Sequence, residues 1–176
     1  MIMPRGQQLL LPANPLFVVF SMLAAMLVNM TASISVFGNA AWLPDLLSIV
    51  LVFWCVHQPR IVGIGLAFLF GVLTDVHQAA LMGQHALAYT VLGFLAVTIH
   101  RRLLWFSVPS QAMQVFPLFF IAHGLELMVR MLAGDTFPGF WLLLAPVFEA
   151  ALWPVMNSLL LAPQRRAPDP DADRPL

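Results

Sequence analysis

The chain has 176 residues, of which 61% are hydrophobic and 9% are charged, and its formal net charge is zero. A soluble domain carries roughly 25% charged residues, so this chain has too few polar groups to cover a water-facing surface and is predicted to be an integral membrane protein. Lysine is absent and the eight arginines form no extended basic patch, which argues against nucleic acid as a partner.

The first half of the chain predicts three membrane-spanning helices. Residues 1–14 form a short polar segment, and the apolar residues 15–37 would make a helix of about 34 Å, enough for one span. Residues 42–76 would make a helix of about 52 Å, which is too long for one span. The polar break at His57 to Arg60 contains Pro59 and predicts two short helices, 42–57 and 60–76. Both are near or below the usual length, so we expect them to thin the bilayer or to be shielded by their neighbours.

The second half predicts three more spans, at about 84–100, 108–133 and 140–162, followed by a disordered tail at 163–176. The expected fold is therefore an all-α, polytopic membrane helix bundle of six spans covering residues 15–162. Arginine is enriched in cytoplasmic loops. With both termini in the cytoplasm, only Arg130 lies outside, whereas a single span over 42–76 would place Arg101 and Arg102 outside.

The segment 60–76 carries small residues every four positions, at Gly63, Ala67 and Gly71, and the pattern ends at Asp75. Residues four apart share a helix face, and small residues let helix backbones approach closely in lipid. The pattern predicts that the other helices pack around this one. The first helix carries a similar stripe that could face it, formed by Ser21, Ala25, Asn29 and Ser33.

Two aspartates are expected near the outer ends of their helices. Asp45 follows Pro44 at a helix start, where its side chain can cap the helix, although a functional role stays open. Asp75 lies in the last turn of its helix, where the helix dipole disfavours a negative charge. Asp75 therefore needs a partner or water, which makes it the stronger functional candidate.

Two further acidic residues fall inside later spans. Glu126 precedes Arg130 by four residues, the favourable order for an ion pair, and His123 shares their face. This group is interpreted either as a neutralised pair or as a polar cluster that binds a partner helix or a ligand. Glu149 lies near the middle of the membrane, where an isolated charge would cost about 2.5–3.5 kcal/mol, so it is expected to be protonated or paired with Arg130 or His123. Its helix face continues with Trp153 and Asn157.

The sequence carries no motif of a hydrolase, a zinc protease or a phosphate-binding loop. The five histidines are scattered, and the single Cys55 lies in an apolar run, where a small buried hydrophobe is the simplest interpretation. No catalytic residue, cofactor or metal ion is predicted, and the chain is not expected to be an enzyme.

Several segments resemble the rod shape-determining protein MreD family, over about residues 15–162: Pro44 to Leu47, Trp54, Pro59, Gly63 to Asp75, Leu81 to Gly83, and Ala86 with Leu87. The resemblance implies a non-enzymatic component of the bacterial inner membrane that helps to scaffold lateral peptidoglycan synthesis and to maintain rod cell shape. The implied partners are MreC and, indirectly, MreB and the RodA–penicillin-binding protein synthase. The family's fold is similar to that of the substrate-binding subunits of energy-coupling-factor transporters. The family has no established catalytic residues, and the positions that match its pattern are Asp45, Gly71, Asp75 and Gly83.

On this interpretation, the helix from Gly63 to Asp75 either holds the bundle together or docks the membrane helix of MreC. The alternative function is a small-solute-binding subunit of a membrane transporter, with a cavity lined by His123, Arg130 and Glu149. A third possibility, an intramembrane enzyme, would require a hydrolytic activity that depends on Glu149.

Overall fold

The computed structural model describes residues 14–35, 42–137 and 139–164. Within these ranges the chain is helical and contains no strand. The helices are α1 (Pro15–Ser35), α2 (Leu46–His57), α3 (Ile64–Gln78), α4 (Gln84–Leu103), α5 (Val108–Leu132), the 3-10 helix η1 (Phe140–Leu143), α6 (Leu144–Leu161) and the 3-10 helix η2 (Ala162–Gln164). The all-helical prediction is confirmed for these residues. The N-terminal segment 1–13, the expected turn at Gly38 to Ala41 and the tail beyond residue 164 lie outside the described residues.

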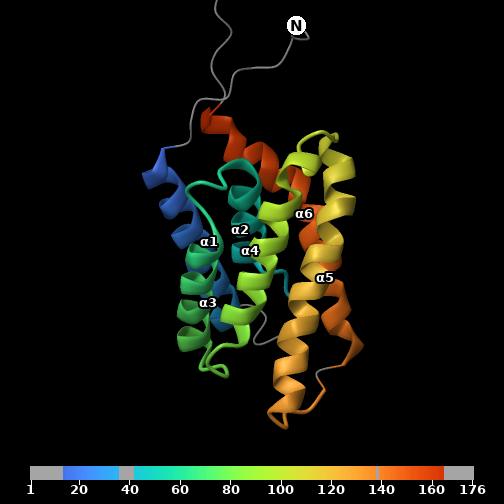
Figure 1. Ribbon diagram of the computed structural model, residues 1–176. Helices are drawn as coiled ribbons and strands as arrows, with labels where there is room; N and C mark the ends of the chain where they lie inside the picture. Colours follow the sequence, from blue (N-terminus) through green and yellow to red (C-terminus); the bar gives the residue numbers. More distant parts are fainter. Residues whose placement is uncertain (1–13, 36–41, 138, 165–176) are drawn as a thin grey trace, which may run out of the picture.

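Successive helices run in alternating directions, so that α1 begins and α6 ends at the same end of the bundle (Figure 1). Two helical segments, Val108–Leu132 and Phe140–Gln164, are each 25 residues long and apolar enough to cross a membrane. Three other apolar helical segments are shorter, namely Pro15–Thr31, Leu46–His57 and Ile64–Gln78. By length and composition alone, two spans are therefore supported directly.

The central helix of the bundle is α2. All its residues from Leu47 to Val56 are buried, and it packs against α1, α4 and α6. A helix of 12 residues is only about 18 Å long, shorter than the hydrocarbon layer of about 30 Å. Of the two expected alternatives, a thinned bilayer or shielding by neighbouring helices, the burial of α2 agrees with shielding. In α3 only five residues are buried. The prediction that the other helices pack around residues 60–76 is therefore wrong, because α2 is covered on all sides, whereas α3 packs mainly against α4 and leaves large apolar side chains exposed, among them Phe68 and Leu73.

Both ends of α2 follow from the local sequence. The side chain of Asp45 accepts hydrogen bonds from the backbone nitrogens of Leu47, at 2.9 Å, and Ser48, at 3.2 Å, which confirms the capping prediction. The helix stops before Pro59, and the backbone nitrogen of Val62 then donates to the carbonyl oxygen of Gln58 at 3.0 Å.

The polar stripe of α1 bonds to α2. The indole nitrogen of Trp54 donates to the hydroxyl of Ser21 at 2.8 Å, and the backbone nitrogen of Leu46 donates to the side-chain oxygen of Asn29 at 3.1 Å. Asn29 also lines a small pocket with Thr74 and His77 of α3, but both Ser21 and Asn29 bond to α2, so the stripe does not face α3 alone as expected. The reason is that α2 presents a buried indole and unpaired first-turn amides, which need acceptors where no water is available. The side chain of Ser33 lies outside the described residues.

Candidate functional site

The predicted small-residue strip packs α3 directly against α4. A Cβ atom built on Gly71 would lie 2.4 Å from the Cα of Ala86 and 2.7 Å from the carbonyl oxygen of His85, so only glycine fits there. Ala67 is buried, and a Cβ built on Gly93 of α4 would lie 3.0 Å from the Cβ of Ala67. The α3–α4 pair is the most extensive helix contact in the described bundle.

Gly63 does not take part in this contact. It lies just before the first residue of α3, and a Cβ built on it would have no atom within 4 Å. The face that carries Ala67 and Gly71 is covered by α4. The strip therefore holds two helices of this chain together and leaves no room there for a partner helix.

The carboxylate at the end of the strip caps the next helix. Asp75 is 1% exposed, and its two oxygens accept hydrogen bonds from the backbone nitrogens of Gly83 at 2.9 Å, His85 at 2.8 Å and Ala86 at 3.3 Å. The Nδ1 atom of His85 lies 2.8 Å from the same carboxylate. Four polar groups at the start of α4 thus depend on one side chain of α3.

Gly83 explains why the cap comes from another helix. Its φ angle is +101°, which a residue with a side chain adopts only under strain, and glycine has no side chain with which to cap α4 itself. The first amide groups of a helix have no acceptor within the helix and favour a negative charge. Asp75 lies at the unfavourable end of α3, but it also lies at the favourable end of α4.

A second set of polar residues, the central polar network, joins five helices: the buried Tyr89 of α4 and Glu149 of α6, and the half-buried Asn29 of α1, Asp45 before α2, and His123 and Glu126 of α5. The hydroxyl of Tyr89 donates to the carboxylate of Asp45, as does the side-chain nitrogen of Asn29, at 2.5 Å. The backbone nitrogen of Asp45 donates to Glu149 at 2.9 Å.

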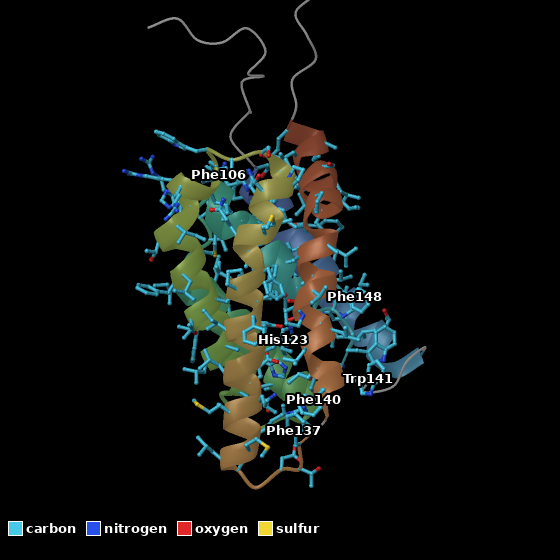
Figure 2. All side chains as sticks on the ribbon, turned by 90° about the vertical axis from the view of Figure 1, so that its right-hand side faces the viewer. Phe106, His123, Phe137, Phe140, Trp141 and Phe148 are labelled. Atoms are coloured by element: carbon cyan, nitrogen blue, oxygen red, sulfur yellow. The ribbon has the colours of Figure 1, made fainter. Side chains whose placement is uncertain are left out.

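The network continues to α5 through a histidine placed between two carboxylates. His123 lies about halfway along α5 (Figure 2); its Nε2 atom is 2.8 Å from Glu149 and its Nδ1 atom is 3.4 Å from Glu126. Glu149 therefore pairs with His123, one of its two expected partners. The expected ion pair between Glu126 and Arg130 is wrong, because Glu126 contacts His123 on the same helix face, and Arg130 forms no ion pair with the described residues.

Asp45 lies at the end of its helix, as expected, but deeper in the bundle than a position near the outer surface of the membrane. It contacts Glu149, which lies nine residues, or about 13 Å of helix, after the start of the last helical segment at Phe140. Asp45 therefore lies inside the bundle, because α2 is too short to reach the end. Two atoms there have no hydrogen-bond partner among the described residues although they are buried, Oε2 of Glu149 and Oδ1 of Asn157.

The predicted face of α6 continues to a glutamine that the sequence analysis missed. Trp153 and Asn157 both donate to the side-chain oxygen of Gln111, at 3.2 Å each. Tyr89 and His85 were missed as well. Each is an isolated polar side chain in an apolar helix, and this isolation was the available signal, since a polar group in a membrane helix needs a partner. Among the described residues, no group of three or more His, Cys, Asp or Glu side chains is arranged to hold a metal ion.

Residues 13–162 match the family model of the rod shape-determining protein MreD. The chain belongs to the MreD family. No curated protein and no solved structure matches it. The resemblance seen in the sequence is thereby confirmed, and with it a role in rod shape determination. MreD proteins are membrane proteins and structural components of the shape-determining system, and the family is not known for enzymatic activity.

Proposed function

We propose that this MreD-family protein is a non-enzymatic scaffold of the cell-elongation complex in the bacterial inner membrane. It binds MreC within the membrane and, indirectly, MreB and the RodA–penicillin-binding protein synthase. The observation that carries this proposal is that the buried and half-buried side chains of the central polar network bond to one another across five helices. Such a network fixes the relative positions of the helices, which is what a scaffold requires.

The outer surface supports the same proposal. Large apolar side chains are exposed on every helix from α1 to α6 except α2, among them Phe20, Phe68, Phe94, Phe116 and Val155. A groove of about 320 Å³ between α5 and α6 is lined partly by small residues, Ala112, Ala150 and Ala151. Because small residues favour helix association in lipid, apolar helix faces are the surfaces through which a membrane partner would bind.

We also propose six spans with both termini in the cytoplasm. The alternating helix directions in Figure 1 and the arginine distribution both agree with this arrangement. The fold similarity to the substrate-binding subunits of energy-coupling-factor transporters stays a prediction.

The topology predicts the activity of alkaline phosphatase fusions, since this enzyme is active only outside the cytoplasm. Fusions after Met82 and after Gly134 are expected to be active, whereas fusions after Arg60 and Arg102 are expected to be inactive. An immunoblot checks that the fusions after Arg60 and Arg102 are expressed at the same level as the active fusions, so that their inactivity reports location. An active fusion after Arg102 would contradict the six-span arrangement.

The scaffold proposal predicts the partners that co-purify with the tagged protein from mildly solubilised bacterial membranes. Mass spectrometry is expected to find MreC and the cell-wall synthase enriched at least tenfold over a control with an unrelated tagged membrane protein. Recovery of a transporter ATPase pair without MreC would contradict the scaffold and favour the transport alternative.

One observation favours that alternative, a small-solute-binding subunit of a membrane transporter. Oε2 of Glu149 is buried and has no partner among the described residues, so it could accept a hydrogen bond from a bound solute. A solute that raises the melting temperature of the purified protein, but not that of a Glu149→Gln variant, would support this function.

A further inference from the structure

The turn between α4 and α5 combines exposed basic and exposed apolar side chains. Arg101 and Arg102 are exposed in the last turn of α4. Leu104, Trp105 and Phe106 follow, all exposed, and Trp105 is 90% exposed, more than any other large hydrophobic residue in the described part of the chain. The free energy of the system falls when apolar groups cover the indole ring and an anion binds the arginines.

The backbone holds this turn in one conformation. The backbone nitrogens of Trp105 and Phe106 donate to the carbonyl oxygens of Arg102, at 3.2 Å, and Leu103, at 3.1 Å. Leu103 is fully buried, and the side chain of the buried Gln111 donates to the carbonyl oxygen of Phe106 at 3.0 Å. Figure 2 shows Phe106 at this end of the bundle. Trp105 is therefore exposed because its hydrogen-bonded turn is fixed with its side chain outward.

The charge at this end is positive throughout the described residues. The described acidic residues are Asp45, Asp75, Glu126, Asp135 and Glu149, and none of them forms an ion pair with Arg101 or Arg102. The turn between α2 and α3, which contains Arg60, lies at the same end (Figure 1). No described acidic residue therefore neutralises Arg101 or Arg102, and their guanidinium groups are available to bind an anion.

The exposed stripe of α4 indicates where the anion would come from. Leu87, Phe94 and Arg101 are exposed at intervals of seven residues, so they lie along one side of the helix. In a membrane protein the apolar part of such a stripe contacts lipid chains. Arg101 therefore lies where this lipid-facing surface reaches the headgroups, and Trp105 lies at the depth that tryptophan prefers.

We propose that Arg101, Arg102 and Trp105 form a binding site for the headgroup of an anionic phospholipid. The arginines bind the phosphate, and the indole ring covers the upper part of the lipid chains. A lipid fits this site better than an acidic protein does, because the site is continuous with the apolar stripe of α4.

The test is a lipid titration of the purified full-length protein in neutral detergent, followed by native mass spectrometry. We expect phosphatidylglycerol to bind more tightly than phosphatidylcholine. The double variant Arg101→Gln/Arg102→Gln is expected to weaken phosphatidylglycerol binding roughly 25-fold, about fivefold for each basic group. The control is Arg130→Gln, which matches each single arginine variant by removing one positive charge, here from the C-terminal part of α5, and is expected to leave the affinity unchanged.

The melting temperature in phosphatidylcholine checks that each variant is folded. If the double variant fails to insert, the single variants are measured, each with an expected fivefold loss. Equal wild-type affinity for the two lipids, or an equal loss in Arg130→Gln, overturns the proposal. Competition by glycerol phosphate at the lipid's own concentration also overturns it in favour of a soluble phosphate. Unchanged lipid affinity of the double variant also overturns the proposal. If the double variant then loses an acidic cytoplasmic protein from pull-downs, the site belongs to a protein partner.

Discussion

Replacement of Gly71 by alanine is expected to destabilise the protein by about 1–3 kcal/mol, the usual cost of overpacking a close contact. The new methyl carbon would lie 2.4 Å from the Cα of Ala86 and 2.7 Å from its nitrogen, and both are backbone atoms that no side-chain rotation can move away. α3 and α4 must therefore separate, which also lengthens the hydrogen bonds of Asp75. The melting temperature of the purified protein in detergent measures the effect.

The matched control is Gly65→Ala in the same helix. A Cβ atom built on Gly65 has no atom within 4 Å, and alanine stabilises a helix interior by about 0.5–1 kcal/mol relative to glycine. Gly65→Ala is therefore expected to leave the melting temperature unchanged or to raise it. Equal melting temperatures for the two variants would show that α3 and α4 do not approach as closely as described.

Replacement of Asp75 by alanine is expected to destabilise the protein by roughly 3–5 kcal/mol, comparable to breaking a buried charged pair. The change leaves the amides of Gly83, His85 and Ala86 without their acceptor. Each unsatisfied buried amide costs about 1–3 kcal/mol, and total stabilities are only about 5–15 kcal/mol. The amount of folded protein after detergent extraction, measured by size-exclusion chromatography, is expected to fall sharply.

Two further variants separate the cap from a general effect of charge. Asp135→Ala removes an exposed carboxylate that accepts a hydrogen bond from the neighbouring Thr136, and it is expected to behave as wild type. Asp75→Asn keeps one acceptor oxygen and is expected to lie between the wild type and Asp75→Ala. If Asp75→Ala accumulated as well as Asp135→Ala, the cap would not be needed for folding.

The sequence predicted the helices well because their signals are local. Apolar length marked each helix, Pro59 marked the break after α2, and Pro44 with Asp45 marked its start. The close packing at Gly71 was also predictable, since a four-residue spacing of small residues fixes a helix face.

The positions of the helices relative to one another could not be predicted in the same way. The apolar runs of α2 and α3 look alike in sequence, and only the packed bundle shows that α2 is covered on all sides. Asp75 showed that it needed a partner, but the partner amides belong to another helix. The four-residue spacing predicted that Glu126 pairs with Arg130. In the structure Glu126 contacts His123 instead, and His123 is held in place by Glu149 of α6, which no local spacing rule could reveal.

The enclosed position of α2 has a consequence for how the protein is made. α2 and α3 leave the ribosome before α4 and α6, the helices that later cover α2 together with α1. Until then a helix of 12 residues, too short to cross the bilayer alone, carries the carboxylate of Asp45 at its exposed start. The last helix brings Glu149 to the backbone nitrogen of Asp45. Biogenesis of the bundle is therefore complete only when its final helix has been inserted, and a chain cut short before α6 leaves one side of α2 uncovered and the backbone nitrogen of Asp45 without Glu149.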